Sequence, residues 1–243
     1  MTLIRIDKFL SNSGYGTRNE VKALISRGKV SINGNIIKDP GFKIDEASSK
    51  LEINGNSVSY NKYIYIMLNK PGDVVSAVTD KEHKTVVDLI EEYKSRGIFP
   101  VGRLDKDTTG LLILTNNGAF THNTLSPKKH IDKTYYLECS GILDNNAVEK
   151  MKAGIIIDTN YKCKPALLNI LEYRDNTTYA EITISEGKFH QVKKMIACVG
   201  GRVTKLKRIK FGKIKLDEAL KEGEYRLLNQ EEMNYVNEIL KKR

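Results

Sequence analysis

The first thirty residues repeat apolar side chains at helical intervals. The apolar positions of this repeat are Ile6, Phe9, Leu10, Val21, Leu24 and Ile25. Thr17 and Glu20 have the spacing of a capping box, which predicts that a second helix begins at Thr17. Gly28 suits the end of that helix, because glycine tolerates the left-handed backbone of a helix C-terminus. The pattern therefore predicts two amphipathic helices with their apolar faces turned toward one small core.

Short alternating stretches follow the two predicted helices. Val30 and Ile32 are apolar positions of a strand pattern, and Asn33-Gly34 and Asn54-Gly55 are typical of hairpin turns. A small sheet is therefore expected beside the helices. Polar residues from Ser57 to Lys62 suit a linker. We expect the first domain to cover residues 1–60.

The pattern from residue 61 to residue 243 predicts a second, larger domain. Strands are expected at Tyr63–Leu68, Ile98–Val101, Leu111–Leu114 and Thr134–Cys139, and around Ile155, Leu167 and Ile182. Helices are expected from about Thr85 through Leu89 and Ile90, around Val148 and Met151, and across Met233, Val236 and Leu240. Strands and helices that mix in this way predict an α+β fold.

The charge balance points to an acidic partner. The chain has 40 Lys and Arg residues against 30 Asp and Glu, a net charge of +10. Such a balance fits nucleic acid or an anionic membrane surface. No apolar stretch approaches the roughly 20 residues of a spanning helix, and the N-terminus lacks the apolar block of a secretory signal. We therefore expect a cytoplasmic protein that binds nucleic acid.

The chain lacks the cysteine motifs of zinc and disulfide proteins and the glycine motifs of nucleotide-binding enzymes. The three cysteines are far apart and never form a Cys-x-x-Cys pair, which predicts reduced, buried thiols rather than a zinc site or a disulfide framework. The chain lacks Gly-x-Gly-x-x-Gly and a Gly-Lys-Ser/Thr phosphate loop. No metal or cofactor is indicated.

The positive charge is concentrated in two segments. Residues 1–38, the first basic cluster, contain seven Lys or Arg residues against Asp7 and Glu20. Residues 188–215, the second basic cluster, contain ten Lys or Arg residues and no acidic residue. Because like charges repel at short range, we expect a polyanion to neutralise the second basic cluster.

A glycine-bounded turn holds the strongest candidate chemistry. Residues 101–113 read Val-Gly-Arg-Leu-Asp-Lys-Asp-Thr-Thr-Gly-Leu-Leu-Ile, so Arg103, Asp105 and Asp107 precede a predicted apolar strand. Polar residues at a strand end are often site residues. Aspartates beside glycine also order tight turns through backbone hydrogen bonds. Spacing alone leaves both interpretations open, and the turn-ordering role is the interpretation we favour for Asp107.

The first domain resembles the S4-like RNA-binding domain. The family pattern Arg-Ile-Asp-Lys-Phe-Leu, Thr-Arg and Gly-Lys-Val-x-Ile-Asn-Gly is present between Arg5 and Gly34. An amphipathic helix pair with a solvated basic face is the plainer alternative. The resemblance implies RNA contacts from the polar residues Arg5, Lys8, Thr17, Arg18, Lys22, Arg27 and Lys29.

Local motifs of the second domain resemble bacterial pseudouridine synthases. The motifs are Gly-Arg-Leu-Asp at residues 102–105, Lys-Thr-Tyr at 133–135 and Glu-Gly-Lys-Phe-His-Gln-Val-Lys-Lys-Met at 186–195. Further matched islands are Met67–Pro71, Thr115–Gly118, Ser126–His130, Lys164–Ala166 and Gly223–Arg226. Together they resemble the small-subunit (16S) ribosomal RNA synthase A type. The resemblance implies an S4-like domain followed by a mixed, mainly antiparallel sheet with flanking helices.

The resemblance also implies roles for site residues. Asp105 would be the catalytic carboxylate, and Lys193 the cation beside it, although the wider superfamily more often has arginine there. Tyr135 would lie against the target base, and Arg103 would enter the RNA when the uridine is extruded. Lys194 and Arg208 are further RNA-binding candidates in the second basic cluster. For His190 we favour a structural hydrogen-bonding role.

The implied reaction is uridine isomerisation in ribosomal RNA by a monomer without a cofactor. A free aspartate has a pKa of about 3.9 and is ionised at neutral pH. Attack on the ribose C1′ and removal of the 2′ proton both need that carboxylate, so the route stays open. Three alternatives remain: a large-subunit (23S) enzyme, a non-catalytic ribosome-associated RNA-binding protein, and a glycoside hydrolase with Asp105 and Asp107 as its carboxylates. Adjacency in one turn and basic surroundings argue against the hydrolase.

Overall fold

The computed structural model divides into two compact units. It describes residues 3–13, 15–45, 49–58, 63–126, 131–158 and 160–241. The first unit runs up to Ile64 and includes Ile90–Ile98, and the second comprises Tyr65–Leu89 and the chain from Phe99. The predicted domain boundary, between residues 60 and 61, lies outside the described residues. Among those residues, no helix combines the length and apolarity that crossing a membrane requires.

The first unit combines three helices with short strands among its described residues. Its elements are β1 (Leu3–Arg5), α1 (Ile6–Asn12), α2 (Arg18–Ser26), β2 (Val30–Ile32), β3 (Asn35–Ile37), β4 (Lys43–Asp45), β5 (Leu51–Ile53), β6 (Asn56–Ser57) and α3 (Glu91–Lys94). Strand β1 pairs antiparallel with β4, and the other strands form a sheet in the order β3-β2-β5-β6. Ile6, Phe9 and Leu10 of α1 and Val21 and Ile25 of α2 are buried in one core with this sheet.

Local sequence signals form as predicted in this unit. The Thr17 side chain accepts a hydrogen bond from the Glu20 backbone N–H, and the Glu20 carboxylate accepts one from the Thr17 N–H, which confirms the capping box. Asn33 and Asn54 both adopt positive φ, 49° and 52°, at the hairpin turns β2–β3 and β5–β6. Asparagine-glycine pairs tolerate this backbone, so the hairpins are specified locally.

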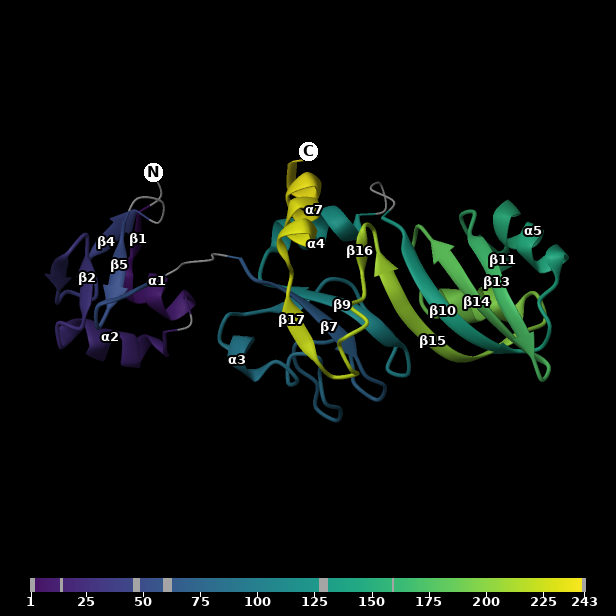
Figure 1. Ribbon diagram of the computed structural model, residues 1–243, viewed down its shortest axis with the longest axis horizontal. Coiled ribbons are helices and arrows are strands. Elements are labelled where there is room, and N and C mark those ends of the chain that lie inside the picture. The colour runs from purple at the N-terminus through teal and green to yellow at the C-terminus, as the bar shows by residue number, and fades with distance from the viewer. Residues whose placement is uncertain are drawn as a thin grey trace. The chain divides into compact units, whose positions relative to one another are not determined.

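The second unit is built around one large sheet (Figure 1). Its strands are β7 (Tyr65–Lys70), β8 (Phe99–Pro100), β9 (Thr109–Thr115), β10 (Lys133–Ser140), β11 (Ile156–Ile157), β12 (Tyr161–Lys162), β13 (Leu167–Arg174), β14 (Thr177–Ile184), β15 (Arg202–Phe211), β16 (Ile214–Lys215) and β17 (Tyr225–Leu227). Its helices are α4 (Gly118–Leu125), α5 (Asn145–Ala153), α6 (Gln191–Ala197) and α7 (Gln230–Lys241). The mixed, mainly antiparallel fold with flanking helices is confirmed.

The nine-stranded sheet contains one parallel junction among the described strands. Its order is β13-β14-β10-β15-β9-β7-β17, with β16 beside β15 and β8 beside β9. Strands β15 and β9 run parallel and pair Lys207 with Thr109 and Arg208 with Gly110. All other strand pairs among the described residues of this sheet are antiparallel. The parallel junction joins the two halves of the sheet beside the turn that carries Asp105.

One predicted helix is wrong. The segment from Thr85 to Ile90 is not helical, and Thr85 instead forms a parallel bridge with Val75. The Asp88 carboxylate accepts hydrogen bonds from the Thr85 backbone N–H at 3.0 Å and from its hydroxyl at 2.8 Å. Together with the hydrogen bond from the Asp88 N–H to the Thr85 hydroxyl, at 3.2 Å, these are capping-box contacts, yet the segment continues as turns and α3 begins only at Glu91.

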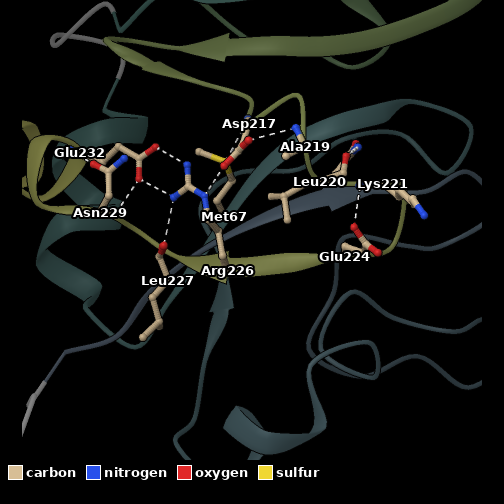
Figure 2. A network of polar contacts seen from close by, with 11 residues as sticks. Met67, Asp217, Ala219, Leu220, Lys221, Glu224, Arg226, Leu227, Asn229 and Glu232 are labelled. Carbon is tan, nitrogen blue, oxygen red and sulfur yellow. Dashed lines mark hydrogen bonds and ion pairs between the residues drawn. The ribbon is translucent and has the colours of Figure 1, made fainter.

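A hydrogen-bonded cluster around Arg226 holds β17 near the start of α7. Figure 2 shows its guanidinium between two carboxylates, with Nε 2.6 Å from Asp217 and the terminal nitrogens 2.8 and 2.9 Å from Glu232. The hydrogen bond with Glu232 is the main cause that raises the pKa of Arg226. Helix α7 packs beside α4 (Figure 1), where Val236 and Phe120 share the same apolar core.

The cysteines are free thiols. Cys139 and Cys163 are buried, as predicted, whereas Cys198 is exposed. Burial raises the pKa of Cys163 to about 11, so this thiol stays protonated at neutral pH. The expectation that all three thiols are buried is therefore wrong for Cys198.

Candidate active site

Backbone hydrogen bonds fix the turn that carries Asp105. This turn, residues 103–108, lies between β8 and β9. The Thr108 N–H donates to the Asp105 carbonyl at 3.1 Å. The Ser76 hydroxyl donates to the Leu104 carbonyl at 2.9 Å and accepts from the Leu104 N–H at 3.0 Å. The backbone on the N-terminal side of Asp105 is therefore anchored to a distant loop.

A buried lysine also holds the turn that carries Asp105. Lys70, at the end of β7, has no exposed surface, and its ammonium donates to the carbonyls of Pro71, Lys106 and Thr108 at 2.9, 3.1 and 2.9 Å. Burial lowers its pKa from 10.5 to about 8, while the nearby charges of Asp107 and Asp105 act in the opposite direction. In the sequence, Lys70 belongs to a matched motif and carries no local sign of this structural role.

The parallel junction explains Gly110 and corrects the role predicted for Arg208. Gly110 has φ of +97°, and a Cβ there would collide with the backbone of Arg208 on β15. Arg208 is only 3% exposed, and its Nε donates to the Leu111 carbonyl at 2.7 Å. Its guanidinium also lies 5.3 Å from the centre of the Phe211 ring. The prediction that Arg208 contacts RNA is wrong in this structure, because its side chain is used inside the unit.

A hydrogen-bonded loop positions helix α6 beside the turn. The buried Gln191 side chain donates to Glu186 at 2.6 Å and accepts from the Lys188 N–H at 2.8 Å. Glu186 also accepts from the Tyr161 hydroxyl at 2.7 Å and from the Lys164 N–H at 3.0 Å. The first turn of α6 is thereby tied to β12 and the residues that follow it.

Lys193 on α6 lies between the two aspartates of the turn. Its Nζ is 3.7 Å from Asp105 Oδ2, and 2.6 and 2.7 Å from the two carboxylate oxygens of Asp107. The hydrogen bond from Lys193 is the main cause that lowers the pKa of Asp107. The predicted cation is therefore beside Asp105, but its short contacts go to Asp107, which the sequence had suggested for turn ordering.

His190 also faces Asp105. Its Nε2 lies 3.7 Å from Asp105 Oδ1, on the other carboxylate oxygen from Lys193. His190 adopts left-handed backbone angles, φ 54° and ψ 28°, immediately before α6. This backbone is uncommon for a residue with a side chain, and such strain is often found at functional sites. The structure thus brings into the site a residue to which the sequence assigned only a structural role.

One small pocket, of about 80 Å³, is lined by Asp105, Tyr135, Arg103, His190 and Lys193. Tyr135 on β10 is 8% exposed, and the next residue, Tyr136, has its hydroxyl on Glu138 at 3.3 Å. The two tyrosines therefore have different surroundings, as strand alternation predicted. The pocket wall also includes Thr108, whose buried hydroxyl has no hydrogen-bond partner among the described residues.

A larger cavity, of about 400 Å³, lies elsewhere in the second unit. Its wall includes Thr134, Lys210, Lys213, Tyr235 and Glu238, and none of the predicted catalytic residues. Lys213 and Glu238 form an ion pair of 2.7 Å in this wall. The larger cavity therefore differs from the small pocket, where the predicted catalytic residues and several charged groups converge.

Four of the ten basic residues of the second basic cluster form ion pairs with acidic residues that are distant in sequence. Lys193 pairs with Asp107, Lys194 with Asp158 at 2.8 Å, Lys205 with Glu138 at 3.2 Å and Lys213 with Glu238 at 2.7 Å. The Lys188 ammonium lies 4.7 Å from the centre of the Tyr161 ring. Acidic residues that are distant in sequence therefore neutralise part of this segment, and a polyanion remains the expected counter-charge for the rest.

The first basic cluster is mostly unpaired. Arg5 donates to Asp7 at 3.1 and 2.9 Å, and Thr17 is occupied by its capping interaction with Glu20. Five other predicted contacts are exposed and form no ion pair in the described part of the chain: Lys8, Arg18, Lys22, Arg27 and Lys29. These side chains keep their charge available to a phosphate backbone.

Comparison with known proteins places this geometry in a family. The RNA pseudouridylate synthase model matches residues 64–198, and the S4 domain model matches residues 4–48. The chain belongs to the RNA pseudouridylate synthase family. Its members are isomerases that act on uridine in RNA, and this chain is such an enzyme with an S4 domain. The alternatives of a non-catalytic binding protein and a glycoside hydrolase are thereby discarded.

Curated relatives match over nearly the whole chain. An uncharacterized RNA pseudouridine synthase of Bacillus subtilis is 44% identical over 97% of this chain and 99% of its own length. The ribosomal small subunit pseudouridine synthase A of Vibrio parahaemolyticus is 37% identical, covering 96% and 99% of the two chains. The ribosomal large subunit pseudouridine synthase B of Bacillus subtilis is 36% identical, covering 94% and 93%.

A solved structure supports the fold. A crystal structure of a pseudouridylate synthase superposes with a TM-score of 0.67 and 34% identity, covering 96% of this chain and 99% of that one. The predicted combination of an S4-like domain and a pseudouridine synthase domain is therefore confirmed.

Proposed function

We propose that this enzyme isomerises a uridine of ribosomal RNA, with Asp105 as its catalytic carboxylate. The observation that carries the proposal is the pocket in which Asp105, Tyr135 and Lys193 meet. Three separate segments of the chain, the turn before β9, strand β10 and helix α6, contribute these three residues. Motifs that are distant in sequence thus converge on one carboxylate, as a catalytic site requires.

Asp105 begins the reaction in either of two balanced routes. As a nucleophile, its carboxylate forms a bond to ribose C1′ while the C1′–N1 bond breaks, and the electron pair leaves on the uracil. As a base, it removes the 2′ proton while the same C1′–N1 bond breaks. In both routes the uracil then turns and C5 bonds to C1′. In the first route the bond between Asp105 and C1′ breaks at this step, and in the second C2′ regains its proton. The proton on C5 is then lost, and N1 gains one.

The neighbouring groups support this chemistry. The Lys193 ammonium at 3.7 Å stabilises the negative charge of Asp105 electrostatically. Tyr135 offers its ring to the uracil and its hydroxyl to the proton that leaves C5. Arg103 is exposed at the pocket, where it enters the RNA as the uridine is extruded. Extrusion is needed because a stacked base hides its glycosidic bond, and it costs a few kcal/mol.

The S4 domain supplies affinity through its unpaired charges. Lys8, Arg18, Lys22, Arg27 and Lys29 bind RNA phosphates, and Lys194 adds a contact near the catalytic site. Phosphate contacts of this kind release counterions and depend on salt. The enzyme acts as a monomer on ribosomal RNA in the cytoplasm.

The small-subunit (16S) RNA is the substrate that we propose first. The motif Lys164–Ala166 supports it, and so does the 37% identity with a small-subunit enzyme. A large-subunit (23S) target is the second candidate, because a large-subunit enzyme is 36% identical. Part of the motif Ser126–His130, which also favoured the small-subunit type, lies outside the described residues.

Mapping pseudouridine in both ribosomal RNAs tests the proposal. RNA from cells with and without the gene is compared, and cells without it are complemented by the native gene or by an Asp105→Asn copy. The proposal expects one 16S position to lose pseudouridine and only the native gene to restore it. A missing 23S position would select the second candidate, and an unchanged map of both RNAs would refute the ribosomal substrate.

A further inference from the structure

Phe189 exposes an aromatic ring beside the catalytic pocket. It is 73% exposed, the highest value among the large hydrophobic residues that are exposed in the described chain. Exposed apolar surface has a free-energy cost that folding would remove by burying the ring. A single exposed apolar side chain is ordinary on a protein surface, so exposure alone carries little. A role for the exposed Phe189 ring is therefore inferred from the residues around it.

The segment around Phe189 is held in place by the loop network. Lys188 and Gln191 flank it, and the Gln191 side chain bonds to both Glu186 and the Lys188 N–H at 2.6 and 2.8 Å. His190 keeps its left-handed backbone within this network. The ring of Phe189 is therefore presented to solvent by a constrained segment, in which a strained conformation is maintained.

Phe189 is also linked to the catalytic carboxylate through one neighbour. Its ring stacks on the His190 ring with 3.8 Å between centroids and 20° between planes. His190 Nε2 in turn lies 3.7 Å from Asp105 Oδ1. The Lys194 ammonium lies 5.5 Å from the centre of the Phe189 ring. An aromatic platform with an adjacent cation thus stands one side chain away from Asp105.

We infer that Phe189, stacked on His190, binds a nucleobase of the RNA next to the extruded uridine, while Lys194 contacts the accompanying phosphate. Aromatic rings beside basic residues bind single-stranded nucleic acid by stacking with the bases. Extrusion of one base exposes the faces of its neighbours, and a platform near the pocket replaces part of the lost stacking. The inference rests on the proposed function, because it takes RNA as the ligand of this site.

The absence of tryptophan from the chain allows a direct test. Because the chain has no Trp, the Phe189→Trp variant carries a single indole at the proposed platform. The variant is titrated with oligouridylate of about twelve nucleotides, within the range of single-strand sites. A ribose-phosphate chain of the same length without bases is the matched probe. The Leu227→Trp variant, at a 49% exposed position on β17, is the matched protein control.

If a base stacks on residue 189, oligouridylate should quench the indole fluorescence of Phe189→Trp, and the chain without bases should not. The fluorescence of Leu227→Trp should respond to neither probe. An indole signal that stays flat, or that responds equally to both probes, would overturn the inference.

Activity provides an independent readout. On ribosomal RNA from cells that lack the gene, Phe189→Ala and Phe189→Leu are expected to raise KM about 5- to 150-fold, and Phe189→Tyr to retain the native value. Native KM in Phe189→Ala would reject the platform and leave the proposed function intact. No pseudouridine formation by any protein, including the native one, would reject the proposed function, and the fluorescence result would still decide the platform.

Discussion

The two basic clusters look alike in sequence and differ in their surroundings. In the first, Lys8, Lys22 and Lys29 are exposed and unpaired among the described residues. In the second, Lys193 and Lys205 meet carboxylates that come from distant segments of the chain. Net charge along the chain is therefore a poor guide to where a protein binds a polyanion. Charge that remains unpaired after folding is the better guide.

This difference between the two basic clusters separates RNA affinity from catalysis. Unpaired charges of the first basic cluster are available to phosphates anywhere along an RNA. In the second basic cluster, four of the ten basic residues are ion-paired inside their own unit, and Lys193 lies beside Asp105. We therefore expect changes in the two clusters to alter different quantities.

Apart from Asp105 itself, the largest effect is expected from Lys193. Lys193→Ala removes the cation beside Asp105 and should lower the rate of pseudouridine formation about 10²- to 10³-fold, the usual cost of losing one electrostatic group at a catalytic site. Asp107→Asn is the matched variant, because it removes the other partner of Lys193. Single-turnover assays should show a smaller loss for Asp107→Asn. Native turnover by Lys193→Ala would exclude it from the site.

A salt titration of RNA binding tests the contrast between the two basic clusters. Replacing Lys22, Arg27 and Lys29 by Gln should remove about three phosphate contacts. Between 50 and 200 mM salt, RNA affinity should then fall about 20- to 40-fold less than in the native protein. The double variant of Lys205→Gln and Lys213→Gln is the control, since both lysines are ion-paired. Equal changes of salt dependence in the two proteins would contradict the contrast between the clusters.

Arg208 should affect stability rather than binding. Arg208→Met leaves the Leu111 carbonyl without its buried donor and should lower the free energy of unfolding by about 1–3 kcal/mol. Denaturant unfolding measures this loss. The salt dependence of RNA binding should be unchanged, and a shallower dependence would return Arg208 to the set of phosphate contacts.

Local signals predicted most of the fold. The capping box at Thr17 and the Asn-Gly hairpins depend on neighbours in sequence, so their structure could be read directly. The segment from Thr85 has capping contacts with Asp88, but Thr85 pairs with Val75 and the segment continues as turns, which the apolar spacing did not indicate. Long-range pairing of β15 with β9, which buries Arg208, had no local signal.

Only the site residues that belong to recognisable motifs could be predicted from the sequence. Asp105, Tyr135 and Lys193 were named from a family resemblance and line one pocket. The support of the turn by Lys70 and the approach of His190 to Asp105 depend on contacts between distant segments. Such contacts follow from tertiary structure, which residue spacing does not encode.

We expect the carboxylate of Asp105 to perform the chemistry. Asp105→Asn keeps the size of the side chain and removes its charge. Pseudouridine formation and RNA affinity are measured on the same purified variant with the same ribosomal RNA. The account predicts that pseudouridine formation is lost while RNA affinity stays near the native value, because the first basic cluster is untouched. Continued formation of pseudouridine by this variant would contradict it.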